Sequence, residues 1–395
     1  MMQGVSEAAA HAAEPRAEVV VDLDAIRHNV ALLAEQAAGS GASTMAVVKA
    51  DGYGHGAVPV ANAALAAGAS WLGVCTLDEA LDLRQAGITA PILSWLHLPG
   101  EAFAPAVAAN VDLSVSSVRH LAAVVDAARA VGRPARVHLK LDSGLSRNGA
   151  QPSVWTDLVD EAAKAAADGS AEVVAVWSHL AHADAPRDPT LDRQAQRLEQ
   201  AYQVAVERGL RPMRHLANSA ATMTRPDLHF DLVRPGIAVY GLDPLGRPPA
   251  QTPLRPAMTF RTRVALMKRV PAGEGVSYGH EWTTPRPTNL ALLPVGYADG
   301  VPRRLGGHLE VLLAGRRRTV VGRVCMDQVV VDCGDDRVEE GERAILFGPG
   351  GNGEPTAQDW ADSLGTIHYE VVTAISDRRV TRTVAGTLPG TAAHE

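Results

Sequence analysis

With 395 residues, of which 46% are hydrophobic, the chain is long enough to build a large core and more than one domain. Its net charge of -7 and pI near 6.1 argue against a nucleic-acid-binding protein. Three cysteines are too few for a disulfide framework, and no segment has the apolar stretch of a signal peptide or the roughly 18 residues of a membrane span. We therefore expect a cytoplasmic protein that binds neither nucleic acid nor membrane.

The first predicted elements are a short strand near 18–22 and an amphipathic helix that begins at Leu23 and stops at Gly39. Short apolar runs then alternate with Ala-rich helical stretches, one of which opens with a capping box from Thr76 to Glu79. The strand candidates lie at 44–49, 71–75, 91–95, 112–116, 136–142, 172–178, 213–218 and 231–241. Eight strands, each but the last followed by a helix, favour a (β/α)8 TIM-like barrel over an open sheet.

The pattern changes at about Pro256, where MTFRTRVALM alternates at period two and short β-like runs follow. This predicts a mostly-β C-terminal domain. The expected organisation is a tail at 1–17, a barrel at 18–255, a β domain at 256–385 and a tail at 386–395. The strand near 18–22 could pair with the β domain. We interpret the arginine triplet at 316–318 as a solvated turn, with a polyanion site as the alternative.

Lys49 ends the first predicted barrel strand, in the stretch TMAVVKADGYGHG. In barrel enzymes the chemistry takes place at the carboxyl ends of the strands. A desolvated lysine there could attack a carbonyl and form a Schiff base. It could equally extend its ammonium group into solvent, and position alone leaves both interpretations open.

Several other strand ends carry groups suited to chemistry. They are Arg147, His179, Asn218, Ser219, Arg234 and Gly236. The segment HLAHAD, from 179 to 184, is weak as a metal site because a third strong ligand and helical spacing are missing. The segment FGPGGNGE, at 347–354, matches a dinucleotide-binding pattern only formally and favours a glycine-rich loop. No metal is expected.

Six motifs together resemble the alanine racemase family, which uses pyridoxal 5'-phosphate (PLP). In chain order they are AVVKADGYGHG, HLANSAAT, VRPGIAVYG, VSYGHEW, PVGYADG and GRVCMDQV. The likeness runs from about residue 18 to 382, and six motifs in one order are far more specific than any single pattern. The resemblance implies a homodimer of a barrel domain and a β domain.

The resemblance also implies how the cofactor is held. Lys49 matches the family's Schiff-base lysine, and Arg234 matches the residue that faces the pyridine nitrogen, with His179 hydrogen-bonded behind it. The positions that match the phosphate-binding residues are Tyr53, Ser219, the backbone of Gly236 and Ile237, and Tyr369. Hydroxyl and backbone N–H groups suit a phosphate dianion, and an arginine at the pyridine nitrogen leaves that nitrogen without a proton.

Racemisation needs an acid–base group on each face of Cα. By resemblance these groups are Lys49 for the D-enantiomer and Tyr278 for the L-enantiomer. Arg147 and the Met326 backbone match the positions that hold the substrate carboxylate, and Arg147 is one cation that could favour the tyrosinate. Lys140 occupies the position of a carbamylated lysine in many family members. In the family, the positions of Tyr278 and Met326 serve the active site of the other subunit.

The sequence departs from the family pattern at Gly52, where alanine is usual, and at His280 and Glu281, which replace a pair that commonly ends in threonine. The expected function is the interconversion of L-alanine and D-alanine, which supplies D-alanine for peptidoglycan. The alternatives are a broader serine and alanine racemase and a PLP-binding homeostasis protein without turnover. A decarboxylase of the same architecture is disfavoured, because it should place an acidic residue where Arg234 stands.

Overall fold

The computed structural model describes residues 15–375 and 378–386, so the expected tails at 1–17 and 386–395 lie outside the described residues except for 15–17 and 386. The chain divides into two compact units. Of the described residues, one unit contains 21–258 with 384–386, and the other contains 15–20 with 259–375 and 378–383. Within the described residues, no helix is long and apolar enough to span a membrane.

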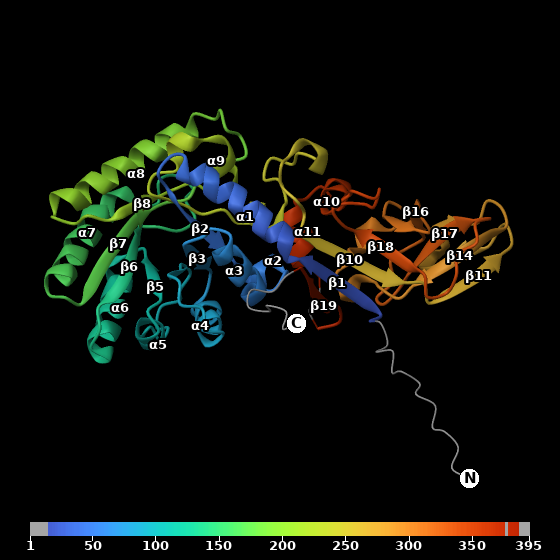
Figure 1. The fold of residues 1–395 in the computed structure, drawn as a ribbon, viewed down its shortest axis with the longest axis horizontal. Helices are drawn as coiled ribbons and strands as arrows, with labels where there is room; N and C mark the ends of the chain where they lie inside the picture. Colours follow the sequence, from blue (N-terminus) through green and yellow to red (C-terminus); the bar gives the residue numbers. More distant parts are fainter. Residues whose placement is uncertain (1–14, 376–377, 387–395) are drawn as a thin grey trace, which may run out of the picture. The chain divides into compact units, whose positions relative to one another are not determined.

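The first unit is built around eight parallel strands (Figure 1). In chain order they are β2 (Ser43–Val47), β3 (Trp71–Val74), β4 (Ile92–Ser94), β5 (Asp112–Val115), β6 (Ala135–Lys140), β7 (Ala171–Trp177), β8 (Met213–His215) and β9 (Leu232–Val233). They pair in sequence from β2 to β8, and β9 pairs with β2. Two backbone bonds, Asp231 N–H to the Arg214 oxygen (3.0 Å) and Arg234 N–H to the Ala217 oxygen (2.9 Å), join the two remaining edges. The expectation of a TIM-like barrel is confirmed.

Helices lie on the outer side of these strands (Figure 1). They are α1 (Leu23–Ala38), α2 (Lys49–Tyr53), α3 (Ala57–Ala66), α4 (Leu77–Gln85), α5 (Ala104–Ala108), α6 (Val118–Val131), α7 (Pro152–Ala167), α8 (Thr190–Glu207) and α9 (Ser219–Thr224), with 3₁₀ turns η1 (Pro226–Leu228), η2 (Ile237–Tyr240) and η3 (Pro249–Gln251). Helix α4 begins with the predicted capping box, in which Thr76 and Glu79 satisfy each other's backbone N–H groups. Helix α1 buries Leu23, Ile26 and Val30 and is capped by Gly39, as its period predicts.

Two strand ends differ from the prediction. The first barrel strand stops at Val47, so Lys49 begins α2 rather than ending a strand. The predicted strand at 231–241 is a two-residue strand followed by η2. Pro235 has no N–H to continue a ladder, and Gly236 adopts φ -110° and ψ -91°, which turns the chain into η2.

The second unit contains a nine-stranded sheet in the order β11-β14-β17-β16-β15-β18-β10-β1-β19. Its strands are β1 (Ala17–Asp22), β10 (Met258–Arg263), β11 (Leu266–Val270), β14 (Thr288–Leu293), β15 (Glu310–Leu313), β16 (Arg316–Val321), β17 (Val329–Gly334), β18 (Arg343–Phe347) and β19 (Thr381–Ala385). A hairpin of β12 (Gly275–Val276) and β13 (Trp282–Thr283), helices α10 (Ala357–Leu364) and α11 (His368–Thr373), and turns η4 (Tyr278–His280), η5 (Tyr297–Asp299) and η6 (Arg303–Leu305) complete it. Strand β1 lies between β10 and β19, so both ends of the chain contribute to this sheet.

The arginine triplet at 316–318 is not a solvated turn, and that interpretation was wrong. These residues begin β16, and the Arg318 side chain is buried. Its guanidinium donates to the carbonyl oxygens of Leu313 (3.0 Å) and Cys333 (3.2 Å) and pairs with Asp336 (2.9 Å). A buried charge is tolerated when its hydrogen bonds are satisfied in this way, which a pattern of three like charges does not reveal.

Candidate active site

The chain turns sharply just after Lys49. Ala50, Asp51, Gly52 and Tyr53 all have positive φ, between 50° and 61°, which makes one turn of left-handed helix. Left-handed backbone costs roughly 1–2 kcal/mol for each residue with a Cβ, so other contacts must hold the turn. Glycine is the one residue type for which this conformation carries no Cβ penalty.

Two carboxylates hold this left-handed turn. Glu79 accepts the Ala50 N–H (2.6 Å) through one oxygen and the Cys75 N–H (2.7 Å) through the other. Asp51 accepts the Ala57 N–H (2.8 Å) at the start of α3. Because Ala50 directly follows Lys49, these bonds fix the backbone from which the lysine side chain extends.

A set of hydroxyl and backbone N–H groups gathers beside the turn. A Cβ on Gly236 would lie 2.5 Å from the Tyr53 hydroxyl, so a larger residue there would displace the tyrosine side chain. The Ser219 hydroxyl oxygen accepts the N–H groups of Gly236 (2.8 Å) and Ala238 (3.3 Å). The Tyr53 and Ser219 hydroxyls thus lie beside the backbone that begins η2 at Ile237, and neutral hydroxyl and N–H groups are of the kind that binds phosphate.

Arg234 is buried at the carboxyl end of β9, with 4% of its surface exposed. It donates to the Nδ1 atoms of His215 (3.1 Å) and His179 (3.3 Å) and to the carbonyl oxygens of Ser178 (3.0 Å) and Leu216 (3.2 Å). Within residues 15–375 and 378–386, no carboxylate pairs with this guanidinium. Burial lowers the pKa of Arg234 to about 9, which leaves it protonated at neutral pH.

The ring of Trp177, at the end of β7, makes cation–π contacts with two side chains. The Arg234 guanidinium carbon lies 4.8 Å from the ring centroid and Lys140 Nζ lies 4.2 Å from it. The ring also stacks on His215, with centroids 5.2 Å apart. Cation–π contact offsets part of the cost of burying these charges.

The cations crowd one another. Burial, followed by the charges of Arg234 and Arg147, lowers the pKa of Lys140 from 10.5 to about 7. Burial, followed by Arg234, Arg147, Lys140 and Lys49, holds the pKa of His179 well below its usual value. Four cations thus act on a single histidine, and such a site favours anionic ligands.

Of the predicted residues in the second unit, called the β unit from here on, Tyr278 and Met326 lie on two connected loops. Tyr278 begins η4 and is 70% exposed, and Met326 is 52% exposed. The Ser277 hydroxyl donates to the Arg323 carbonyl oxygen (2.7 Å), which ties the tyrosine turn to the loop that carries Met326. Tyr369 lies on α11, where its ring stacks on that of His368.

The motif PVGYADG supports the same loop. The Met326 carbonyl oxygen accepts the Ala298 N–H (3.0 Å), and the Cys325 carbonyl oxygen accepts the Tyr297 N–H (3.0 Å). A Cβ on Gly296 would lie 2.5 Å from the Met326 oxygen. The glycine therefore allows the two backbones to approach closely enough to form these bonds.

Two family models match the chain, "Alanine racemase, N-terminal domain" over residues 21–244 and "Alanine racemase, C-terminal domain" over residues 257–384. The chain belongs to the alanine racemase family. It is 60% identical over 375 residues to a protein of Salinispora tropica named alanine racemase, which covers 95% of this chain and 100% of that protein. A relative of the same name from Frankia casuarinae is 56% identical and covers 92% and 95% of the two chains.

Solved structures agree with this assignment to the alanine racemase family. The structure of alanine racemase from Streptomyces coelicolor A3(2) has a TM-score of 0.91 and 52% identity, and covers 94% of this chain and 98% of that one. The enzyme from D-cycloserine-producing Streptomyces lavendulae has a TM-score of 0.91 and 50% identity, with 95% and 98% covered. The expectation of an isomerase built from a barrel and a β domain is confirmed.

Sequence reasoning missed several polar residues inside this racemase barrel. His215 lies as close to Arg234 as His179 does, yet only His179 was predicted there. His138, behind His215, was also missed. A signal was present, because His138 is two residues before Lys140 on one strand and so points to the same side of the sheet.

The departures from the alanine racemase pattern have local partners. Glu281 forms an ion pair with Arg323. The His280 ring packs against Gly275, where an added Cβ would lie 2.2 Å from His280 Cγ. Gly52 has φ 61°, and a Cβ there would lie 3.3 Å from the Ala57 nitrogen. An alanine at residue 52 would therefore need a small shift of α3.

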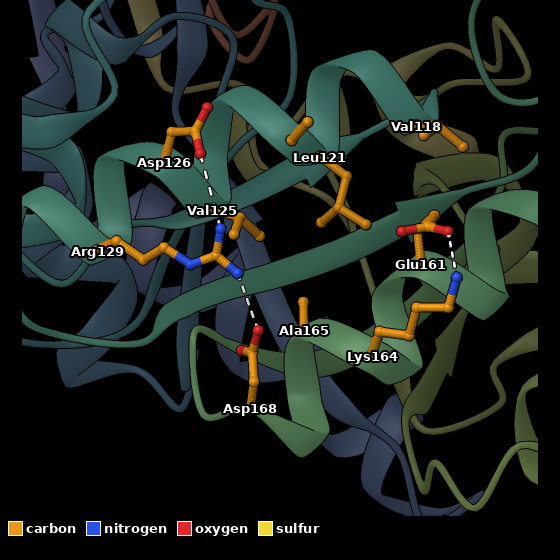
Figure 2. Close-up of a pocket in the computed structure, with 10 residues that line it drawn as sticks. Val118, Leu121, Val125, Asp126, Arg129, Glu161, Lys164, Ala165 and Asp168 are labelled. Carbon is orange, nitrogen blue, oxygen red and sulfur yellow. Dashed lines mark hydrogen bonds and ion pairs between the residues drawn. The ribbon is translucent and has the colours of Figure 1, made fainter.

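A groove of about 170 Å³ lies between α6 and α7 (Figure 2). Arg129 bridges Asp126 and Asp168 across it, and Lys164 pairs with Glu161. The charged side chains of the groove are thus paired with one another. None of the residues that line the groove belongs to the predicted site.

Proposed function

We propose that the chain is a PLP-dependent racemase that interconverts L-alanine and D-alanine by a two-base mechanism and so supplies D-alanine for peptidoglycan. The observation that carries the proposal is Arg234, a buried guanidinium that contacts histidines and carbonyl oxygens and can only donate. A donor that cannot give up its proton suits an unprotonated pyridine nitrogen. Such a nitrogen disfavours the side reaction of transamination.

The residues of the barrel fit PLP. The Tyr53 and Ser219 hydroxyls and the backbone at Gly236 and Ile237 would hold its phosphate, and a Cβ on Gly236 would fill this cradle. Lys49 would hold its reactive carbon. When bound, PLP supplies an aldehyde that captures the amino group and a ring that acidifies the Cα–H bond. Tyr369, in the β unit, is proposed as a further phosphate contact.

Two side chains of this protein would transfer the Cα proton. Lys49 Nζ would remove or return the Cα proton on the D side, and the Tyr278 hydroxyl would do so on the L side. Two groups on opposite faces are needed because a single base tends to return the proton to the face it came from. Arg147 and the Met326 backbone would hold the substrate carboxylate and keep Cα between the two bases.

The proposal includes a homodimer with shared sites. The exposure of Tyr278 and Met326, which is unusual for residues of a catalytic centre, supports their use by a partner subunit. It also includes carbamylation of Lys140. An ammonium at Lys140 would repel Arg147, whereas a carbamate would attract and hold it.

The deciding measurement is solvent-deuterium exchange at Cα, started separately from L-alanine and D-alanine. We expect exchange from both enantiomers in the wild type. The variant Tyr278→Phe should lose exchange from the L side far more than from the D side, and Lys49→Ala should lose both because it also loses cofactor. Tyr202→Phe, on the outer helix α8, is the matched control and should behave as the wild type.

The outcomes separate the candidate functions. Wild-type protein that binds PLP but exchanges neither enantiomer would be a PLP-binding protein without turnover. Equal exchange from serine would favour the broader racemase. If Tyr278→Phe kept full exchange from L-alanine, the two-base assignment would be wrong.

A further inference from the structure

A row of buried polar side chains runs through the barrel from Arg234. Arg234 contacts His215 Nδ1 (3.1 Å), His215 Nε2 contacts His138 Nδ1 (2.9 Å), and His138 Nε2 contacts the Asp112 carboxylate (3.1 Å). His215, His138 and Asp112 have no exposed surface. The Asp112 carboxylate in turn accepts from Arg136 Nε (2.7 Å). We call Arg234, His215, His138 and Asp112 the buried row.

The two ends of the buried row fix every proton between them. Arg234 can only donate, so His215 Nδ1 must accept and the proton of His215 must sit on Nε2. That N–H then donates to His138 Nδ1, and the proton of His138 must sit on its own Nε2. The Asp112 carboxylate, which can only accept, ends the row. Both histidines are neutral in this order, in agreement with burial and Arg234 holding the pKa of His215 well below its usual value.

The row spans the height of the barrel. Arg234 follows β9 and His215 ends β8, at the carboxyl end of the strands. Asp112 is the first residue of β5, at the opposite end. The rings of Trp71 and Trp177 pack against His138 (5.6 Å) and His215 (5.2 Å), so aromatic walls replace water along the row.

We propose that Asp112 and His138 are positioning residues for Arg234: they impose one proton order on the row and thereby present a pure acceptor to the guanidinium. The proposal rests on the proposed function, because the role of Arg234 toward PLP is part of it. A carboxylate placed directly against Arg234 would compete for the N–H groups that face the cofactor.

Asp112→Asn tests the proton order without a change of shape. Arg136 Nε, at 2.7 Å from one Asp112 oxygen, would hold the amide oxygen of the variant, which turns the amide NH₂ toward His138. His138 Nε2 would then have to accept, and the protons of both histidines would move to Nδ1. His215 would present an N–H to the Arg234 guanidinium, and that hydrogen bond would be lost.

The first readout is the tautomer of each histidine, measured by ¹⁵N NMR on histidine-labelled holoenzyme and on protein freed of PLP, with assignment by His138→Gln and His215→Gln. We expect the Nε2–H tautomer for both residues in the wild type and the Nδ1–H tautomer in Asp112→Asn. The second readout is kcat/KM for alanine together with PLP affinity, and we expect each to fall by about tenfold or more. A purely structural role would change the unfolding midpoint but not the tautomers.

Glu172→Gln is the matched control, because Glu172 is the other carboxylate on Arg136 but lies outside the buried row. It should change neither tautomers nor kinetics. An Nδ1–H tautomer at either histidine in the wild type, or unchanged tautomers and kinetics in Asp112→Asn, would overturn the proposal. Expected tautomers in a wild type that exchanges no Cα deuterium would support the proton order while refuting the proposed function.

Discussion

Unmodified Lys140 should destabilise the folded protein at neutral pH, and bicarbonate should remove that effect. Burial and the nearby arginines lower its pKa from 10.5 to about 7. Above pH 10.5 the amine is neutral in the folded and the unfolded chain, so no cost arises. As the pH falls from 10.5 to 7, the unfolded chain takes up the proton first, and stability is lost by about 1.4 kcal/mol for each pH unit.

The magnitude at pH 7 is about 4 kcal/mol, which is a large part of the stability of an ordinary domain. The same lowered pKa leaves about half of the amine neutral at pH 7, and a neutral amine can react with CO₂. A carbamate does not take up this proton, so modification should recover most of the lost stability. Replacement of the amine by an apolar chain in Lys140→Met should recover it as well.

The assay is urea unfolding at fixed protein concentration, in CO₂-free buffer and in bicarbonate, at pH 7 and pH 10. At pH 7 the free energy of unfolding of the wild type should rise when bicarbonate is added. Lys140→Met should have a higher free energy of unfolding than the wild type in CO₂-free buffer, and bicarbonate should not change it. Lys164→Met, at an exposed lysine of the same barrel, is the control and should respond as the wild type. If the wild type were indifferent to bicarbonate and Lys140→Met gained nothing at pH 7 relative to pH 10, the reasoning would be wrong.

Three further substitutions test the site. Gly236→Ala places a Cβ against a tyrosine hydroxyl and should lower PLP affinity by about a hundredfold, as followed by absorbance titration, while Gly351→Ala, with open space around it, should leave affinity unchanged. Gly52→Ala should lower the free energy of unfolding by about 1 kcal/mol, because its φ of 61° is strained for alanine; a gain in stability would contradict this. Ser277→Ala removes the hydrogen bond that holds the turn carrying Tyr278, so it should lower kcat more than PLP affinity. Equal losses of kcat and PLP affinity would show that Ser277 does more than position this turn.

The barrel could be predicted because its signal is repeated and local. Each parallel strand is an apolar run, and each helix has its own period and caps, as at Thr76. The left-handed turn after Lys49 could not be predicted, since alanine, aspartate and tyrosine rarely adopt positive φ. It exists because Glu79, 29 residues away from Ala50 in sequence, holds it.

The candidate site was only partly visible in the sequence for a similar reason. Lys49 and Arg234 stand out as charges inside apolar surroundings, and the motifs of the family gave them roles. His138 could have been found from its place two residues before Lys140, but Asp112 does not stand out, because only the register of the neighbouring strands brings it to His138. The register of two parallel strands joined through a helix depends on the whole sheet rather than on local sequence.

Strand β1, between β10 and β19 in the nine-stranded sheet, has a consequence for how the chain acquires its structure. The β unit is assembled from both sides of the barrel sequence, so the barrel is an insertion in it. During synthesis β1 emerges before the barrel, and more than 230 further residues must be made before β10 can pair with it. The barrel can complete its own sheet in that interval, so we expect the β unit, with Tyr278, to fold after the barrel.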